Sequence, residues 1–369
     1  MGGRLADANR NCGSPLGEGD RPGRAGAPGN GVAASVVVVN WNGRDILEPC
    51  LRSLEAQRFR DFEVILVDNG SGDGSVGMVR ERFPWVAEII ENRENLGFGV
   101  ANNQAIVRAR GRYIVLLNND AEADADWLGS LVEAVEADPR VGMCASKILN
   151  FDRRDVIDNT GHLIYRDGLN RGRGRLETDR GHYDLAREAL FPSGCAALYR
   201  KSMLDEIGLF DDTFFAYGDD TDLGLRGRLA GWECVFVPGA RVYHRYSATT
   251  GQYSPTKAFL VERNRVWVAV KVLPLPMLLV SPAYTLARFA LQAYGALTGK
   301  GAAGRYTSEF SALSLLGVLC RAYGAALAGL PHALRERRRI LGGKKVADTE
   351  IRRWFREHGI SVREIALKE

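Results

Sequence analysis

Short β-branched runs alternate with helical patterns between residues 35 and 120. The runs are SVVVVN (35–40), FEVILVD (62–68), VAEIIEN (86–92) and RYIVLLNND (112–120), and helical patterns lie between them near 45–57, 74–83 and 99–110. Strands that alternate with helices in this way are joined by right-handed crossovers, which place the strands side by side. The sequence therefore predicts an α/β domain with a mostly parallel central sheet and flanking helices.

Polar residues end three of the predicted strands. Ligands of open α/β sheets bind outside the carboxyl ends of the strands, so these side chains are candidates for a binding site. An aspartate such as Asp68 can accept a hydrogen bond from a nucleobase imide, although a plain turn explains the same residue. The candidates are Asn40, Trp41 and Asn42 after the first strand, Asp68 after the second, and Asn119 and Asp120 after the fourth.

Asp120 also begins an acidic segment that continues with Glu122 and Asp124. Carboxylates are hard oxygen ligands, so this segment could hold Mg²⁺ or Mn²⁺ against a diphosphate. His244 lies in the segment 233–247, which reads as a strand, a turn at Pro238–Gly239 and a second strand. It is a candidate second ligand of the same metal, and a half-buried structural histidine is the alternative.

A glycine-containing segment, Asn95-Leu96-Gly97-Phe98-Gly99, precedes the third predicted helix. Backbone N–H groups at the start of a helix can bind a phosphate. The order is G-x-G-x-x-N, because Asn102 replaces the third glycine of a dinucleotide fingerprint, and the segment follows the third strand instead of the first. The sequence therefore disfavours a nicotinamide dehydrogenase.

Three carboxylates, Asp219, Asp220 and Asp222, lie at the start of a helical pattern that runs to Leu229. Repulsion between adjacent carboxylates raises one pKa, and the helix dipole lowers it. Such a pair can supply a base that takes a proton from a hydroxyl, although plain N-capping is the simpler alternative. The surrounding aromatic residues are expected in the core or in the wall of an acceptor pocket.

Long apolar stretches begin near Glu262. The longest uncharged piece, 272–287, has 16 residues with three prolines, fewer than the roughly 20 residues that span a bilayer. Segments 283–299 and 307–334 read as apolar helices, and 335–345 carries six basic residues and one acid. This combination predicts helices that lie on an anionic membrane face; packing on the catalytic domain or on a second subunit is the alternative.

Composition excludes several classes of protein. The net charge is only +4, which gives no support for nucleic-acid binding, and six scattered cysteines disfavour a disulfide scaffold or a zinc ribbon. Residues 1–33 contain nine glycines and no apolar signal segment, so we expect a disordered leader. These features predict a cytoplasmic protein.

Six motifs together resemble the inverting family 2 glycosyltransferases, especially bacterial rhamnosyltransferase-like members. The motifs are VVNWNG, VDNGSGDGS, ENLGFGVANNQAI, LLNND, FFAYGDDTDLGLR and VYHRYSATTG, in this order between about residues 34 and 270. The resemblance implies a GT-A fold at 34–262, followed by a C-terminal helical, membrane-associating region with a basic tail at 263–369. It also implies a nucleotide-diphosphate sugar donor and Mn²⁺ or Mg²⁺ as the cofactor.

The resemblance also implies roles for single residues. Asp220 matches the catalytic base, and Asp219 replaces the glutamate that usually precedes it. Asp120 matches the last acid of the family's metal-binding signature, whose first acid is replaced here by Asn118, and His244 matches a late metal ligand. The implied donor-binding residues are Asn40, Trp41, Asn42, Asp68, Asn95, Gly97, Asn102, Asn119 and Asp120.

The implied reaction moves a sugar, with rhamnose from dTDP-rhamnose favoured, to a saccharide or lipid-linked saccharide in cell-envelope polysaccharide synthesis. Other donors stay open, and the sequence is compatible with a homo-oligomer at the inner face of the membrane. A non-catalytic sugar-nucleotide or glycan-binding scaffold is the alternative, which the retention of Asp120, Asp219 and Asp220 disfavours. A nucleotidyltransferase is disfavoured because NWNGRD stands where that class carries a Gly- and Arg/Lys-rich loop.

Overall fold

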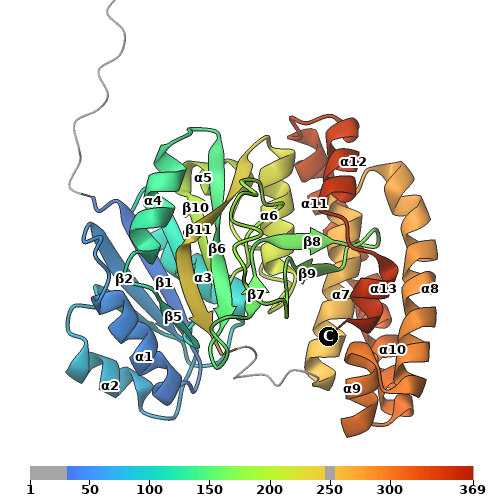
Figure 1. Cartoon of the computed structure of the whole chain (residues 1–369), viewed down its shortest axis with the longest axis horizontal. Helices are drawn as coiled ribbons and strands as arrows, with labels where there is room; N and C mark the ends of the chain where they lie inside the picture. Colours follow the sequence, from blue (N-terminus) through green and yellow to red (C-terminus); the bar gives the residue numbers. More distant parts are fainter. Residues whose placement is uncertain (1–30, 246–253, 369) are drawn as a thin grey trace, which may run out of the picture. The chain divides into compact units, whose positions relative to one another are not determined.

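The first four strands follow the predicted alternation. They are β1 (Ala34–Asn40), β2 (Phe62–Asp68), β3 (Glu88–Glu91) and β4 (Tyr113–Leu117), connected by α1 (Arg44–Glu55), α2 (Ser75–Arg82) and α3 (Phe98–Arg108). This computed structural model describes residues 31–245 and 254–368 (Figure 1). Residues 1–30 of the predicted disordered leader lie outside the described residues.

The central sheet has the GT-A arrangement, parallel in its first half and mixed beyond β4. Its strand order is β3-β2-β1-β4-β10-β6-β11-β5, with β7 beside β6. Strand β10 runs antiparallel to both β4 and β6, whereas β11 runs parallel to β6 and antiparallel to β5. The added strands are β5 (Ala121–Ala123), β6 (Val141–Asn150), β7 (Ile157–Asn159), β10 (Ala196–Arg200) and β11 (Glu233–His244).

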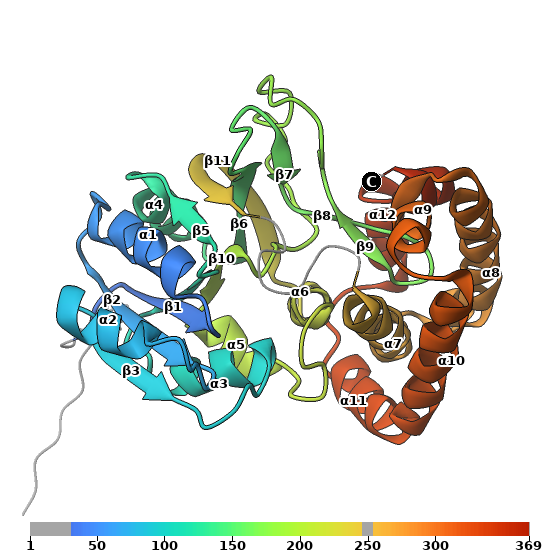
Figure 2. The same ribbon diagram turned by 90° about the horizontal axis from the view of Figure 1, so that it is seen from below.

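Both faces of this sheet are covered by helices (Figures 1 and 2). Along β1, Val36 and Val38 pack with α1, α2 and α4, whereas Val37 packs with α3, α5 and α6. Successive side chains of a strand point to opposite faces, so a strand covered on both faces is apolar throughout. The remaining helices of this region are α4 (Trp127–Glu136), α5 (Lys201–Ile207) and α6 (Asp219–Leu229).

Two sequence predictions are wrong in detail. The predicted turn at Pro238–Gly239 does not separate two strands, because β11 runs through it with a shift of register between Val237 and Arg241. Proline lacks the N–H that a ladder needs, and a bulge accommodates this defect. The segment 150–190 is rich in Arg, Asp and Gly, so its sequence predicts a loop, but it contains β7 and the hairpin of β8 (His162–Ile164) and β9 (Asn170–Gly172).

Seven helices follow the sheet and lie together beyond α6, away from β1 (Figure 2). The predicted helix 283–299 lies within α8, apart from its last residue, and the predicted helix 307–334 is divided among α9, α10 and α11. No single helix in the described ranges is long and apolar enough to cross a bilayer, and only α9 and α10 taken together, bent by 116°, pass that test. The helices are α7 (Pro255–Val272), α8 (Leu275–Thr298), α9 (Gly301–Glu309), α10 (Ala312–Ala328), α11 (Leu330–Gly342), α12 (Asp348–Glu357) and α13 (Val362–Leu367).

The longest of these helices, α8, turns polar residues inward. Its buried residues are Ser281, Thr285, Arg288 and Gly295, whereas Leu279 is 71% and Leu297 is 88% exposed. Arg288 is fully buried and pairs with two carboxylates, those of Asp167 (2.9 Å) and Glu262 (2.6 Å). A helix in contact with water normally shows the reverse pattern.

Candidate active site

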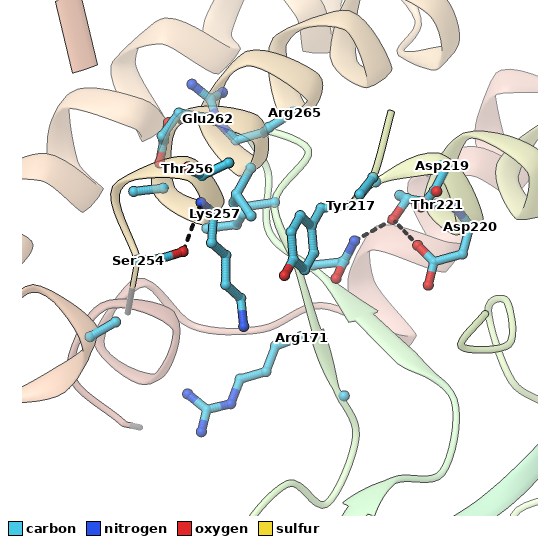
Figure 3. Close-up of a pocket in the computed structure, with 18 of the residues that line it drawn as sticks. Arg171, Tyr217, Asp219, Asp220, Thr221, Ser254, Thr256, Lys257, Glu262 and Arg265 are labelled. Carbon is cyan, nitrogen blue, oxygen red and sulfur yellow. Dashed lines mark hydrogen bonds and ion pairs between the residues drawn. The ribbon is translucent and has the colours of Figure 1, made fainter. Parts of the chain in front are cut away.

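A cavity of about 1260 Å³ lies where the sheet meets the C-terminal helices. One part of it is polar and is formed by the β4–β5 turn, β7, the β8–β9 hairpin and the start of α6. The other part is formed mainly by α8, α9 and α10. Residues from distant segments thus line one cavity, and Figure 3 shows several of them.

The β-strand pairing brings Asp120 and His244 together. Strand β5, which begins directly after Asp120, pairs with β11 so that Ala121 lies opposite His244. Asp120 Oδ1 and His244 Nε2 are 3.4 Å apart, and both side chains are buried. The two predicted metal ligands therefore face each other in the cavity wall.

A second carboxylate orients this histidine. Asp158, on β7, places its Oδ2 2.7 Å from His244 Nδ1, and its other oxygen accepts a hydrogen bond from Arg175 at 2.7 Å. Burial opposes the charged imidazole, but Cys195, Asp120 and Asp158 together raise the pKa of His244 well above its usual value. A carboxylate behind a histidine is the arrangement that fixes the imidazole of a metal ligand. The sequence analysis missed Asp158, which lies in the segment read as a loop.

This donor set fits a divalent cation. Asp120 Oδ1 is buried and has no well-formed hydrogen bond to any described residue. Two ligand atoms of one Mg²⁺ or Mn²⁺ ion lie about 3 Å apart when each bond is about 2.1 Å long. A carboxylate oxygen and an imidazole nitrogen at the observed separation are therefore close to the geometry that such an ion needs.

The two adjacent carboxylates form the second polar group of the cavity. Asp219 and Asp220 are the first residues of α6 and follow Gly218, whose φ is +78°. Phe215 and Tyr217 also have positive φ, near +67° and +65°. Bulky residues adopt this conformation only when the surroundings impose it.

Asn264 on α7 holds this strained loop. Its side chain is fully buried, and Nδ2 lies 2.6–3.1 Å from the backbone oxygens of Phe214, Ala216 and Tyr217. Arg263 adds a hydrogen bond to the Phe214 oxygen at 2.8 Å. The E-R-N-R segment at 262–265 therefore fixes the loop that presents Asp219 and Asp220.

The environments of Asp219 and Asp220 separate their pKa values. Burial and the neighbouring Asp220 charge raise the pKa of Asp219 to about 7. Burial also acts on Asp220, but His162 and the N–H groups of Gly194 and Thr221 lower its pKa overall. At neutral pH the negative charge of the pair is therefore held on Asp220, whose side chain is 17% exposed in the cavity.

His162 is a site residue that the sequence analysis missed. Its Nε2 lies 3.5 Å from Asp220 Oδ2, and its ring stacks on Phe191 with centroids 5.0 Å apart. It lies at the start of β8, where no motif marked it. The isolated D-N-T-G-H at 158–162 is the one signal that could have drawn attention to both His162 and Asp158.

The predicted donor-binding residues fall into two groups. Those that line the cavity are Trp41, Asn95, Gly97, Asn119 and Asp120, together with the predicted aromatic wall residues Phe215 and Tyr217. Those that do not line it are Asn40, Asn42, Asp68 and Asn102. Phe214, also predicted at the wall or in the core, is buried in the core.

The residues outside the cavity lining have partners within the protein. Asp68 accepts hydrogen bonds from Asn40 Nδ2 at 3.0 Å and from the Ser71 N–H at 2.8 Å. Asn40 in turn accepts one from Asn119 at 2.8 Å. Asn102 is buried and donates to the Phe98 oxygen within α3. These side chains therefore support the loops behind the cavity wall.

The start of α3 contacts the loop before α6 instead of open space. The Phe98 N–H donates to the Phe215 oxygen at 2.6 Å, and a Cβ at Gly97 would lie only 2.4 Å from that oxygen. The Gly97 N–H is bonded to Asn95 Oδ1 at 2.9 Å. Two of the N–H groups expected to face a phosphate, those of Gly97 and Phe98, are therefore bonded within the protein, and the Phe98 bond joins two loops of the site.

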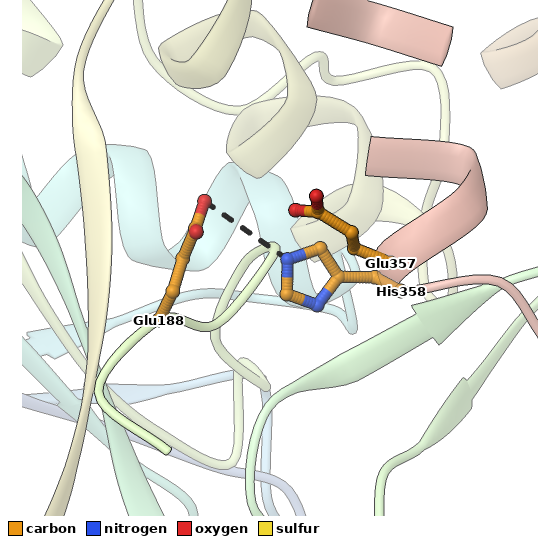
Figure 4. A group of neighbouring side chains, drawn as sticks. All are labelled: Glu188, Glu357 and His358. Atoms are coloured by element: carbon orange, nitrogen blue, oxygen red, sulfur yellow. Dashed lines mark ion pairs between the residues drawn. The ribbon is translucent and has the colours of Figure 1, made fainter. Parts of the chain in front are cut away.

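A further group of metal-ligand types lies at α12, outside this cavity (Figure 4). It consists of Glu188, Glu357 and His358. Glu188 lies 2.5 Å from an Arg228 nitrogen, and Glu357 lies 3.1 Å from an Arg353 nitrogen. Arginines already neutralise both carboxylates. We therefore infer that these side chains hold α12 against the segment before β10.

The sequence of this chain is similar to those of known glycosyltransferases. The sequence model described as glycosyl transferase family 2 matches residues 35–208. N-acetylglucosaminyl-diphospho-decaprenol L-rhamnosyltransferase from Mycobacterium tuberculosis is 29% identical over 264 residues, covering 63% of this chain and 85% of that protein.

Solved structures share the fold. The Staphylococcus aureus TarS 1–349 structure aligns with a TM-score of 0.53 at 18% identity and covers 87% of this chain and 91% of its own. GalNAc-T7, solved with UDP, GalNAc and Mn²⁺, aligns with a TM-score of 0.54 at 19% identity over 66% of this chain and 48% of its own. Residues 35–208 therefore match the family 2 glycosyltransferases in sequence, and the sheet domain shares the GT-A fold of these solved structures.

Proposed function

We propose that the chain is an inverting, metal-dependent glycosyltransferase that uses a nucleotide-diphosphate sugar. The observation that carries this proposal is that the Asp120–His244 pair and the Asp219–Asp220 pair line one cavity. The first pair suits a cation at a diphosphate, and the second suits a base at an acceptor hydroxyl. A binding scaffold needs neither a poorly paired carboxylate nor a separated pair of pKa values.

Asp220 is the base in this proposal. Its carboxylate is ionised at neutral pH and reaches the cavity, so it can accept the proton of the acceptor hydroxyl as that oxygen attacks the anomeric carbon. Below about pH 7, Asp219 is protonated and therefore carries no charge. His162 keeps the charge on Asp220 and orients it. Attack opposite the leaving diphosphate inverts the configuration at the anomeric carbon.

Asp120 and His244 hold Mn²⁺ or Mg²⁺ in this proposal, and Asp158 fixes the imidazole of His244. When bound, the cation neutralises charge on the departing nucleoside diphosphate. Trp41, Asn95, Gly97 and Asn119 line the donor part of the cavity. Asn40, Asn42, Asp68 and Asn102 then act by shaping the loops that carry these groups.

The relative named above suggests the substrates. It is a rhamnosyltransferase whose name specifies a lipid-diphosphate acceptor. We therefore propose L-rhamnose from dTDP-rhamnose as the donor sugar, a saccharide or lipid-linked saccharide as the acceptor, and a role in cell-envelope polysaccharide synthesis.

The C-terminal helices support a peripheral position on the inner face of the membrane. The outward side of α8 is apolar, and further exposed leucines lie on α10 and α11. Exposed Arg335 and Arg338 can contact anionic lipids, whereas Arg337 donates to the Val270 and Leu273 oxygens and is structural. Part of the basic tail therefore stabilises the fold.

A donor-turnover assay tests the proposed function. The full chain is incubated with Mn²⁺ or Mg²⁺ and a panel of dTDP-, UDP- and GDP-sugars, and nucleoside diphosphate release is measured beside an Asp120→Ala variant. We expect metal-dependent release from one nucleotide class, lost in the variant. Failure of every nucleotide to bind would favour the scaffold alternative.

A further inference from the structure

A second cavity, of about 700 Å³, lies at the start of α8 and shares no lining residue with the catalytic cavity. It is lined by β8 and the two residues after it, the first three turns of α8, α12 and the segment that joins α12 to α13. Its described lining residues include three arginines and no acidic side chain. We define this arginine pocket by Arg166, Arg352 and Arg356 together with Pro276, Met277 and Val280 of α8.

Backbone pairing holds the walls of the arginine pocket together. The Ile164 N–H donates to the His358 oxygen at 2.9 Å, and the Ile360 N–H donates to the Ile164 oxygen at 3.2 Å. The side chains of Tyr165 and Phe355, which also line the pocket, are buried. The pocket is therefore formed by packed elements and not by a loose surface loop.

The positive charges of α12 are unequally paired. Arg353 takes two acids of this helix, Glu350 at 2.5 Å and Glu357 at 3.1 Å. Arg352 and Arg356 are exposed and lie four residues apart, so they are neighbours on the helix surface. Neither has a hydrogen bond or an ion pair within the described ranges. Like charges at this spacing repel each other, and an anion between them relieves this repulsion.

Arg166 adds a third charge to the pocket. Its Nη1 donates a hydrogen bond to the Tyr284 hydroxyl at 2.5 Å, and its guanidinium lies 5.1 Å from the centre of the Tyr284 ring. A tyrosine hydroxyl is neutral, so this contact orients Arg166 without cancelling its charge. Arginine presents a planar fork of N–H donors that matches the oxygens of a phosphate. The three arginines together favour a ligand that carries a phosphate.

The α8 side of the pocket is apolar and continues onto the exposed face of this helix. Arg288 is the one charged residue among the 24 residues of α8, and it is buried. Val280 lines the pocket and is 51% exposed. Leu279, which is 71% exposed, follows Pro276 by three residues and therefore lies beside it on the helix surface. An apolar chain can thus extend from the pocket along the outward side of α8.

These features together favour an amphiphile over a soluble phosphate compound. Free phosphate would leave the apolar residues of α8 without a contact. A nucleotide would need a ring face on which to stack its base, but Arg166 covers the Tyr284 ring, and Tyr165 and Phe355 are buried. A phospholipid supplies both parts, a phosphate for the arginines and acyl chains for α8.

We propose that the arginine pocket binds the phosphate head group of an anionic phospholipid, whose acyl chains lie along the outward side of α8. The inference rests on the peripheral membrane position proposed above, and it replaces a general attraction of basic residues with one defined site. A lipid held here fixes which side of the C-terminal helices faces the bilayer.

Titration of the full chain with a short-chain lipid tests the pocket without a membrane. The probe is dihexanoylphosphatidylglycerol below its critical micelle concentration. Calorimetry compares it with dihexanoylphosphatidylcholine, which carries no net charge, and with glycerol phosphate, which has no acyl chains. We expect the anionic lipid to bind about tenfold more tightly than either, since charge-assisted hydrogen bonds and burial of the chains both contribute. Equal affinity for either comparison compound would overturn the proposal.

Substitutions separate the two halves of the site. Arg352→Gln and Arg356→Gln should each weaken binding of the anionic lipid about tenfold and change phosphatidylcholine binding less, because a hydrogen bond to a charged group is lost. Val280→Asn should weaken binding of both lipids and leave glycerol phosphate unaffected. Arg153→Gln, at an exposed arginine that lines neither cavity, is the control of equal charge. Unaltered affinity for the anionic lipid in both Arg352→Gln and Arg356→Gln would refute the site.

Sedimentation with phosphatidylcholine vesicles that contain phosphatidylglycerol keeps this site apart from the membrane position. We expect the unmodified chain and Arg153→Gln to bind the vesicles more tightly than Arg352→Gln and Arg356→Gln do. Equal binding of all four proteins would refute the pocket and leave the peripheral position intact. Failure of the unmodified chain to bind these vesicles would refute the peripheral position, and the lipid site with it.

Nucleotide binding with Mn²⁺ reports on the proposed transferase in the same variants. It should be unchanged, because the arginine pocket and the catalytic cavity have no lining residue in common. Its loss in Arg352→Gln or Arg356→Gln would show that these arginines support the catalytic cavity instead of a lipid.

Discussion

Buried charges serve opposite purposes in the sheet domain and in the C-terminal helices. In the sheet domain, Asp120 Oδ1 is buried, and its nearest polar partner among the described residues is His244 Nε2 at 3.4 Å, which is too long for a well-formed hydrogen bond. In the helices, Arg288 is equally buried, but Asp167 and Glu262 pair with it at 2.9 Å or less. Burial opposes the charge of Glu262, yet Arg288 and Arg265 lower its pKa to about 2.

The comparison shows how to distinguish a reactive charge from a structural one. Native proteins satisfy nearly all buried polar groups, so a poorly paired buried carboxylate such as that of Asp120 is a candidate ligand of a cation. A fully paired charge adds no reactivity, and removing its partner destabilises the protein. The C-terminal helices also expose more apolar surface than the sheet domain. Ten of the fifteen exposed large apolar residues in the described ranges lie on α8, α10 and α11.

Loss of the proposed base should have the largest effect. Asp220→Asn removes the proton acceptor but keeps the side-chain volume, so we expect kcat to fall about 10³- to 10⁴-fold. Nucleotide affinity, measured by calorimetry with Mn²⁺, should change less than threefold. Asp212→Asn, at an exposed aspartate before α6, is the matched control. Near-normal turnover of Asp220→Asn would show that another group takes the proton.

The next largest effect tests the structural charges. Arg288→Met leaves the buried Asp167 and Glu262 with only the longer contacts to Arg265, at 3.6 and 3.2 Å, which should lower the free energy of unfolding by about 3 kcal/mol. Urea denaturation measures this, with Arg335→Met on the exposed side of α11 as the control. A loss below about 1 kcal/mol would mean that the carboxylates find other partners and that the contrast with the sheet domain is weak.

A smaller effect is expected behind the proposed metal ligand. Asp158→Asn keeps the shape of the side chain but removes the charge that orients His244, so Mn²⁺ affinity should fall about 10- to 100-fold. Electron paramagnetic resonance of bound Mn²⁺ measures it. Exposed Asp155→Asn, three residues earlier, should bind Mn²⁺ normally. Unchanged affinity in Asp158→Asn would indicate that His244 does not ligate the ion.

The smallest effect concerns the pH dependence of stability. Asp219 has a pKa near 7 in the folded chain and 3.8 as its ordinary value, so its contribution to stability is complete below pH 4 and is lost as the pH rises to 7. The Asp219→Asn variant has no ionisable group at this position, so its stability does not fall for this reason as the pH rises. We expect the variant to match the parent at pH 4 and to exceed it by about 1–2 kcal/mol at pH 8. Thermal denaturation at both pH values checks this; a variant less stable at pH 8 would contradict the raised pKa.

The polar strand ends were the most informative part of the sequence. Alternating apolar runs predicted β1, β2, β3 and β4 and therefore the edge at which Asp120 lies, because local hydrophobic patterns encode strands and helices. The acidic start of α6 was likewise visible. The hairpin β8–β9 was missed, since short strands that pair antiparallel inside a polar segment leave little periodic signal, and the ten-residue strand β6 was missed as well.

The sequence by itself predicted the α/β sheet, the resemblance to family 2 glycosyltransferases and the candidate side chains Asp120, Asp219, Asp220 and His244. The tertiary structure alone decided which of them meet and which residues support them. Asp158 and His162 become candidate site residues only because β7 and β8 lie beside the cavity, and one part of that cavity exists only because α8, α9 and α10 pack around it. The chemical type of each side chain can be read from the sequence. Which side chains meet depends on contacts between segments up to about two hundred residues apart, and no local sequence pattern records these contacts.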